Sequence, residues 1–296
     1  MGTAIAERLL GAGYALVVYN RTPEKARALG AAGAGVVESP QDLARQADVV
    51  FTSLADDRAL EDVAARALGG ARPGMILVDM STVSPAASAR VAALAEEASV
   101  GYLRAPVSGN PTVVRSGSLT VVVSGPREPF ERAEELIRAV GPTVYYVGGR
   151  EEARVLKLAL NLMIAGLAEL MSEALVLGEA AGISRPALLE VMGASAAGAP
   201  FVKYKTEPLL HDDFSATFTT ALMEKDIDLI LAVAEDADVE LPLARKMKEL
   251  LRAAAEAGYA DLDFIALFLN LRDARGYHEG ATLSPVGAKT DQEVPR

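Results

Sequence analysis

The sequence predicts an α/β domain of the doubly wound Rossmann type followed by an all-helical domain. Two patterns support this prediction. In the first half of the chain, short runs of β-branched residues alternate with segments of helical length, which is typical of βαβ units around a parallel sheet. After Val147 the strand pattern ends, and residues 151–275 show helical patterns throughout.

The change of pattern sets the expected domain boundaries. Gly148 and Gly149 separate the two halves of the chain. We therefore expect an α/β domain at residues 1–149, a helical domain at 150–276, and a polar, flexible tail at 277–296.

Caps and helix breakers mark the elements of the first domain. Ser39 is a candidate helix N-cap, because Pro40 follows at the first helical position and Asp42 comes three residues after the cap. We expect strands at residues 15–19, 35–37, 49–54, 75–79, 102–105, 119–124 and 143–147. We expect helices at residues 3–12, 23–29, 59–68, 85–98 and 129–140, and one that begins at Pro40.

A long helix from Glu151 to Ala181 organises the second half of the chain. It is apolar on almost every side, which predicts burial on all sides. Lys157 and Asn161 interrupt the apolar run and, four residues apart, share one face of the helix. A buried ammonium is costly without a partner. The alternative, from spacing alone, is that Lys157 reaches water and Asn161 caps a loop.

Composition excludes several classes of protein. The chain has no cysteine, which excludes disulfides, thiolate catalysis and zinc–thiolate sites, and its two histidines do not favour a multi-histidine metal site. The net charge of −11 argues against nucleic acid or an anionic membrane as the main partner. No signal peptide opens the chain, and charges break the longest apolar runs, so we expect a cytoplasmic protein.

The loop after the strand at 15–19 indicates a nucleotide site. In dinucleotide-binding folds this position meets the adenosine ribose, where an acid binds the 2′-hydroxyl of NAD and an arginine suits the 2′-phosphate of NADP. Here the loop reads Asn20-Arg21-Thr22, and Lys25 follows one helical turn later. We expect NADP as the cofactor, with NAD as the alternative. An ordinary polar loop is the other interpretation.

The glycine fingerprint of such folds is incomplete in this chain. Gly2 lies 18 residues before Asn20, near the expected spacing, and fits the third glycine, where the helix packs closely on the sheet. The first two glycines and the strand that leads into them are absent. That strand is central in this topology, so its loss leaves neighbouring strand edges unpaired. We expect the native chain to begin about ten residues upstream of Met1.

Later strands are followed by further candidate contacts. Leu54 and Ala55 follow the strand that starts at Val49, and Thr82 follows the strand at 75–79. Because ligands bind beyond the carboxyl ends of parallel strands, both loops are candidates to contact the pyrophosphate or the nicotinamide. Each loop is also compatible with a routine helix N-terminus.

The segment Ser108-Gly109-Asn110 is a candidate substrate loop. It offers a hydroxyl, closely spaced backbone amides and a side-chain amide, a set that suits a carboxylate. Taken alone, the segment is equally compatible with a turn rich in glycine and proline.

Together these motifs resemble the β-hydroxyacid dehydrogenase family, which includes 3-hydroxyisobutyrate dehydrogenase, tartronate semialdehyde reductase and the glyoxylate/succinic semialdehyde reductases. The resemblance extends from Met1 to about Arg275. It rests on the motifs in their order along the chain: Met1-Gly2, Asn20-Arg21-Thr22, Ser81-Thr82, Ala105–Gly109, Ser116–Thr120, Lys157 with Asn161, and Lys225-Asp226.

The resemblance implies an NAD(P)-dependent oxidoreductase that interconverts a small β-hydroxy acid and its semialdehyde. It implies that Lys157 is the catalytic general acid–base. The substrate-binding candidates are Ser108, Gly109, Asn110 and Asn161. The cofactor-binding candidates are Gly2, Asn20, Arg21, Thr22, Lys25, Leu54, Ala55, Thr82 and Lys225. Asn110 stands where this family commonly has glycine, which leaves the size and polarity of the substrate open.

The expected chemistry requires a lysine that titrates near working pH. Burial in an apolar helix and the second cation of Lys225 both favour a lower pKa for Lys157 than the usual value of about 10.4. A lysine with such a pKa can exchange the proton with the substrate oxygen.

Three other interpretations compete with this one. Imine reductases share the fold but usually lack a lysine at this site. A non-catalytic NADP-binding or scaffold protein is the second, and a generic α/β protein whose motifs are only turns and caps is the third.

The sequence also predicts self-association. The apolar long helix and the segment 201–218 predict exposed apolar surface, which favours a homodimer or homotetramer.

Overall fold

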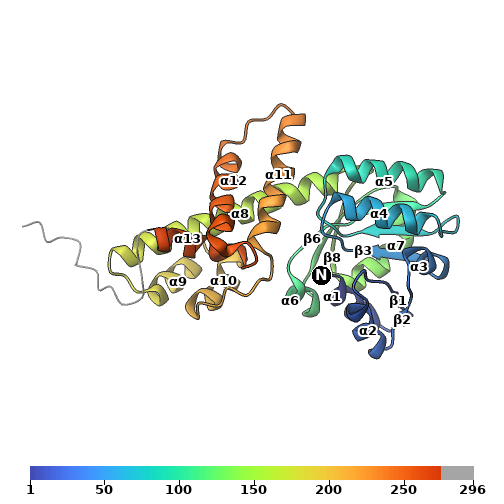
Figure 1. Ribbon diagram of the computed structural model, residues 1–296, viewed down its shortest axis with the longest axis horizontal. Helices are drawn as coiled ribbons and strands as arrows, with labels where there is room; N and C mark the ends of the chain where they lie inside the picture. Colours follow the sequence, from blue (N-terminus) through green and yellow to red (C-terminus); the bar gives the residue numbers. More distant parts are fainter. Residues whose placement is uncertain (275–296) are drawn as a thin grey trace, which may run out of the picture. The chain divides into compact units, whose positions relative to one another are not determined.

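The computed structural model describes residues 1–274, which form two compact units (Figure 1). The first unit contains Met1–Leu160 and Ala232–Val239. The second contains Asn161–Leu231 and, within the described residues, 240–274. The boundary expected at residues 149 and 150 stays a prediction, and the expected tail at 277–296 lies outside the described residues.

A six-stranded sheet forms the centre of the first unit, in the order β3-β4-β5-β7-β6 with β8 paired to β7. The strands are β1 Val17–Val18, β2 Gly35–Val36, β3 Val49–Thr52, β4 Ile76–Asp79, β5 Gly101–Arg104, β6 Val107–Ser108, β7 Thr120–Ser124 and β8 Thr143–Gly148. Each strand expected from the sequence is present, in several cases shorter, and β6 is an addition.

Helices cover both faces of this sheet, as the doubly wound prediction requires (Figure 1). They are α1 Gly2–Gly11, α2 Pro23–Ala31, α3 Pro40–Gln46, α4 Asp57–Leu68, α5 Pro85–Glu97, α6 Pro111–Arg115 and α7 Arg127–Val140. On β4, Leu77 packs with α3, α4 and α5, whereas Ile76 and Val78 pack with α1 and α7. This strand alternation places one apolar core on each face of the sheet.

The sheet is mixed, so the prediction of a parallel sheet is wrong for part of it. β3, β4 and β5 pair in parallel, but β7 runs antiparallel to both β5 and β6. The chain between Arg104 and Thr120 forms β6 and the five-residue helix α6. It therefore lacks the longer crossover helix that usually joins parallel neighbours.

β1 and β2 form a small sheet of their own. β1 pairs with β2 and β3 pairs with β4, and no other strand in the described chain pairs with β1 or β3. α1 packs against the larger sheet, where Ile5 and Leu9 share a core with Val49 and Phe51.

The second unit is almost entirely helical, as predicted. The helices that lie wholly or partly in it are α8 Glu152–Ala180, α9 Arg185–Ala194, α10 Pro200–Leu210, α11 Thr220–Asp236, α12 Pro242–Ala254 and α13 Leu267–Ala274. A π-helical turn at Ala255–Tyr259 and a 3-10 turn at Phe264–Ala266 precede α13. The predicted helix at Glu151–Ala181 is confirmed to within one residue at each end.

The burial of α8 differs from the prediction. Met163, Leu170 and Leu177 are 66%, 61% and 72% exposed. Their spacing of seven residues puts them on one side of the helix, a surface that we call the α8 stripe. The prediction of burial on all sides is therefore wrong for the single chain. Only the side of α8 opposite to this stripe, which includes Leu158, Ala165 and Leu175, is buried in the described residues.

α8 also has the length and composition of a membrane-spanning helix. Its most apolar window has a mean hydropathy of 1.6, and 44% of that window is buried inside the protein. Core helices of soluble proteins commonly meet the same criteria, so this is weak evidence for a membrane span.

The segment 201–218 does not offer the apolar surface that the sequence suggested. Phe201, Val202, Leu209 and Phe214 are buried, and among the large apolar side chains Tyr204 alone is prominently exposed. Phe201 and Phe264 pack with ring centroids 5.7 Å apart. The prediction is wrong here because these aromatic residues form part of the core of the helical unit.

Glu169 on α8 is a buried carboxylic acid without a hydrogen-bond partner among residues 1–274. Its side chain is 5% exposed, and neither carboxylate oxygen is bonded. Burial and the nearby Glu173 raise its pKa to about 7, although Lys246 acts in the opposite direction. The folded state therefore favours the protonated acid, whose contribution to stability is present below pH 4.5 and is lost as the pH rises toward 7.

We predict that Glu169→Gln removes this pH dependence. The difference in unfolding free energy between the variant and wild type should be about 1–3 kcal/mol more favourable to the variant at pH 8 than at pH 5. The reason is that the wild type must ionise a buried group over that range, whereas the variant has no such group. Urea unfolding at both pH values measures it. Glu190→Gln, an exposed glutamate on α9, is the control and should show no such gain. An equal difference from wild type at both pH values for Glu169→Gln would contradict the prediction.

Candidate functional site

The loop after β1 carries two exposed cations. Arg21 and Lys25 both reach solvent, and Thr22 is the N-cap of α2. The side-chain oxygen of Asn20 accepts a hydrogen bond from the Thr22 backbone amide at 2.9 Å. This bond fixes the turn between β1 and α2, so Arg21 lies on an ordered loop at the carboxyl end of a strand and Lys25 in the first turn of the helix that follows.

The first turn of α1 lies beside the loop after β3. A Cβ atom on Gly2 would lie 3.7 Å from Ser53 Cβ, which is an ordinary contact. The helix therefore does not pack as closely at Gly2 as the third glycine of the fingerprint predicts. The turn has no acidic residue and no side-chain cap. Burial, Arg115 and Lys25 lower the pKa of the Met1 amino group. The backbone amides and these cations make this end of α1 suited to an anionic group such as a pyrophosphate.

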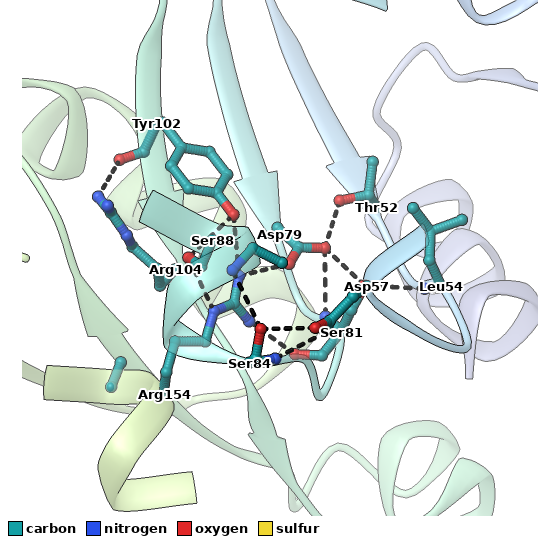
Figure 2. A network of polar contacts seen from close by, with 12 residues as sticks. Thr52, Leu54, Asp57, Asp79, Ser81, Ser84, Ser88, Tyr102, Arg104 and Arg154 are labelled. Carbon is teal, nitrogen blue, oxygen red and sulfur yellow. Dashed lines mark hydrogen bonds and ion pairs between the residues drawn. The ribbon is translucent and has the colours of Figure 1, made fainter. Parts of the chain in front are cut away.

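The loops after β3 and β4 are joined by a serine. Ser81 Oγ accepts a hydrogen bond from the backbone amide of Leu54 at 2.8 Å and donates to Asp79 Oδ1 at 2.6 Å (Figure 2). Ala55 and Thr82, the neighbouring candidates, follow in the same two loops. The carboxyl ends of β3 and β4 therefore form one connected edge, where the fold places a dinucleotide.

A buried arginine attaches the start of α8 to this edge. The Arg154 guanidinium forms an ion pair with Asp79 and donates to the Ser81 carbonyl oxygen at 2.6 Å (Figure 2). Both charged side chains are fully buried. Burial favours a lower pKa for Arg154, but Asp79 and Tyr102 more than offset it, so its pKa lies above the usual value. Arg154 was not predicted from the sequence; its signal was an arginine on the apolar face that also contains Leu158.

Lys157 lies one helical turn after Arg154. It is half-buried, and it belongs to the first unit with the loops described above. Lys157 is thus a cationic side chain on a helix whose first turn is attached to the carboxyl end of β4.

The predicted substrate loop includes β6 and the start of α6. Ser108 ends β6, and Gly109 has a φ of +139°, a conformation that favours glycine. A Cβ atom there would also lie 2.9 Å from side-chain atoms of Leu119 and Val113. Asn110 is the N-cap of α6, and its side-chain oxygen accepts from the Val113 amide at 3.0 Å. The oxygen of Asn110 is therefore engaged in the fold.

In the helical unit, a buried aspartate joins two predicted residues. Asn161 Nδ2 donates to Asp226 Oδ2 at 2.5 Å, and Lys225 Nζ lies 2.8 Å from Asp226 Oδ1. Asp226 has no exposed surface. Asp226 is part of the predicted Lys225-Asp226 motif, but no role was predicted for it from the sequence. Its carboxylate orients the Asn161 amide and balances the charge of Lys225.

A second buried ion pair fixes the loop that leads into α11. Lys205 Nζ lies 2.6 Å from Asp263 Oδ1, and Asp263 Oδ2 accepts from the Thr217 hydroxyl at 2.7 Å. Because α11 carries Lys225 and Asp226, this pair holds the helix on which they stand. Among the residues described, no group of three or more His, Cys, Asp or Glu side chains forms a metal site.

Comparison with known proteins identifies the family. The family model described as the NAD binding domain of 6-phosphogluconate dehydrogenase matches residues 1–148. The model described as NAD-binding of NADP-dependent 3-hydroxyisobutyrate dehydrogenase matches residues 152–270. Both the α/β part and the helical part of the chain are therefore recognised, and both descriptions name a nicotinamide dinucleotide.

Individual proteins give the same result. The uncharacterized oxidoreductase YfjR of Bacillus subtilis is 32% identical over 90% of this chain and 95% of its own length. The chloroplastic glyoxylate/succinic semialdehyde reductase 2 of Arabidopsis thaliana is 29% identical over 93% and 78%. The solved structure of Mycobacterium tuberculosis 3-hydroxyisobutyrate dehydrogenase with L-serine has a TM-score of 0.82 and 28% identity, covering 92% of this chain and 96% of that one.

The matched residues extend through both units, and the strand-end loops and the turn of α1 suit the dinucleotide that the family models name. The protein therefore belongs to the β-hydroxyacid dehydrogenase family and is an NAD(P)-dependent oxidoreductase that acts on CH–OH groups.

Proposed function

We propose that the protein interconverts a small β-hydroxy acid and its semialdehyde with NADP(H), and that Lys157 is the general acid–base. The observation that carries this proposal is the position of Lys157, a half-buried lysine one turn beyond the point where α8 is attached to the nucleotide edge. The Arabidopsis relative is named for glyoxylate and succinic semialdehyde, which are both small carboxylates with an aldehyde group.

Each polar residue has a distinct role in this proposal. When bound, the nicotinamide supplies or accepts the hydride. Lys157 donates a proton to the substrate oxygen in reduction and accepts it in oxidation. Ser108 and the Gly109 amide bind the substrate carboxylate, and Asn110 contributes its amide nitrogen. Asp226 holds the Asn161 amide in the orientation that binds substrate.

The cofactor roles follow from the strand-end loops. Arg21, with Lys25 one turn later, binds the 2′-phosphate of NADP, and Asn20 and Thr22 fix the shape of that loop. The first turn of α1 at Gly2 and the loops of Leu54, Ala55 and Thr82 contact the rest of the dinucleotide. Lys225 contacts the nicotinamide end.

The first prediction from this proposal concerns Lys157. Lys157→Ala should lower kcat by about 10²–10⁴-fold, as expected for the loss of a general acid–base, while NADPH still binds. The assay follows NADPH oxidation with glyoxylate and with succinic semialdehyde. Lys203→Ala, an exposed lysine on α10, is the control and should leave kcat unchanged.

The same assay separates the proposal from its alternatives. Near-normal turnover by Lys157→Ala would remove the lysine from the mechanism. Reduction of cyclic imines with no turnover of the aldehyde acids would indicate an imine reductase. Tight NADPH binding with no turnover of either class would indicate a non-catalytic nucleotide-binding protein.

The second prediction concerns the choice of cofactor. Arg21→Ala should weaken NADPH binding by about tenfold or more and leave NADH binding nearly unchanged, because only NADPH has the 2′-phosphate. Titration of both nucleotides by fluorescence measures this. Arg27→Ala is the matched control, since Arg27 is an exposed arginine on α2, the helix that follows the Arg21 loop, and pairs with Glu24. A similar loss of affinity for both nucleotides would refute the assignment of Arg21.

We also propose that the protein is a homo-oligomer that covers the α8 stripe. An exposed row of Met163, Leu170 and Leu177 is more apolar than a solvent-facing helix side usually is. Burial of these side chains against a second copy would remove that surface from water.

The third prediction tests this assembly. Leu170→Glu combined with Leu177→Glu should convert the oligomer to a monomer, because it places charges in an apolar interface. Light scattering gives the mass. Val36→Glu, which charges an exposed apolar residue of β2, should not change the mass. A monomeric wild type would refute the proposal.

A further inference from the structure

All three guanidinium nitrogens of Arg154 donate hydrogen bonds inside the first unit. Nε donates to Ser88 Oγ at 3.2 Å, Nη1 to the Ser81 carbonyl at 2.6 Å, and Nη2 to Tyr102 OH at 3.0 Å (Figure 2). Nη2 also forms the ion pair with Asp79. One side chain on α8 therefore contacts the end of β4, the Tyr102 side chain of β5, the loop after β4, and α5.

Asp79 connects this arginine to the loops after β3 and β4, which we call the nucleotide loops. Its Oδ1 accepts from Thr52 Oγ1 at 2.6 Å and from Ser81 Oγ at 2.6 Å, and Ser81 Oγ in turn accepts from the Leu54 amide. A continuous path of short polar contacts thus runs from Leu54, beyond β3, through Ser81 and Asp79 to Arg154.

Other contacts hold the start of α8 against β5 and β7. Arg104 on β5 forms an ion pair with Glu151, and Ser124 on β7 accepts from the Ala153 amide at 3.1 Å. These contacts fix the approach to the helix but do not include the loops after β3 and β4. The Arg154 network, in contrast, joins those loops to α8 directly.

Stability alone does not explain a charge pair in this position. Buried ion pairs gain little net stability, because the cost of removing both charges from water roughly cancels their attraction. Apolar residues of similar volume would hold the helix on the sheet as well. What the guanidinium adds is direction, because its planar set of donors fixes several acceptors at once.

We infer that Arg154 is a positioning residue that couples the nucleotide loops to the turn of α8 carrying Lys157. Binding of the dinucleotide at Leu54 and Thr82 then sets the position of the lysine one helical turn beyond Arg154. The inference rests on the proposed role of Lys157.

The test uses variants that separate positioning from folding. Arg154→Met leaves Asp79 buried and unpaired, so it should be unstable. The double variant Arg154→Gln with Asp79→Asn leaves no buried charge and should melt closer to wild type than the single variant does. Arg154→Lys keeps the ion pair with fewer donors. Arg150→Met, an exposed arginine just before α8, is the matched control.

Hydrogen–deuterium exchange with and without NADPH provides a readout that does not depend on turnover. In wild type and in Arg150→Met, NADPH should slow exchange of the amides at residues 152–160. In the double variant NADPH should still bind, within about threefold of the wild-type affinity, but exchange at 152–160 should no longer respond to it. Arg154→Lys should give an intermediate response.

Turnover of glyoxylate or succinic semialdehyde provides the second readout. The double variant should lose about tenfold or more in kcat with little change in the KM for NADPH, because the lysine is misplaced while the nucleotide site persists. A double variant that keeps both the NADPH response of residues 152–160 and its kcat would show that the pair is merely structural and overturn the inference.

Failure of the proposed function would look different. If Lys157→Ala keeps its turnover in the same assay, the catalytic role of Lys157 is wrong, whatever the exchange data show. If Lys157→Ala is inactive and the double variant behaves like wild type, the coupling through Arg154 alone is wrong.

Discussion

The buried ion pair between Arg154 and Asp79 is the interaction on which the arrangement of the first unit depends. Asp79 stands at the carboxyl end of β4, where the chain leaves the sheet and where the fold presents ligands. Without a cation, this buried carboxylate would carry a large desolvation cost. Arg154 offsets that cost and at the same time orders Ser81 and Tyr102 around it. The start of α8 and the nucleotide edge are therefore two parts of one polar network.

The sequence predicted most of the fold because the relevant signals are local. The cap at Ser39, confirmed by its bond from the Asp42 amide, and the β-branched runs are set by near neighbours in the chain. The reversal of β7 was missed because strand direction depends on what the connecting segment does in three dimensions. The sequence predicted exposed apolar surface on the long helix, but it did not predict which side is exposed, because a sequence pattern shows which side chains are apolar and not which of them a single chain covers.

The candidate site shows the same division. Residues such as Lys157, Asn161 and Ser108 could be proposed because their types and spacing form motifs, and their roles remain predictions. Arg154 was not found, because a fully buried arginine looks like a surface arginine until its partners are known. Those partners lie 52 to 75 residues away in the sequence, beyond the reach of helical or strand periodicity.

Arg154 and Lys157 occupy the same unbroken helix, which limits how this part of the chain can change in length. Each residue inserted between them would turn the lysine by about 100° around the helix axis and move it by about 1.5 Å along it. A single insertion or deletion there would aim the lysine at different surroundings even if every side chain were kept. Sequence alignments of functional relatives should therefore show length variation in the loops around the sheet and none between these two positions.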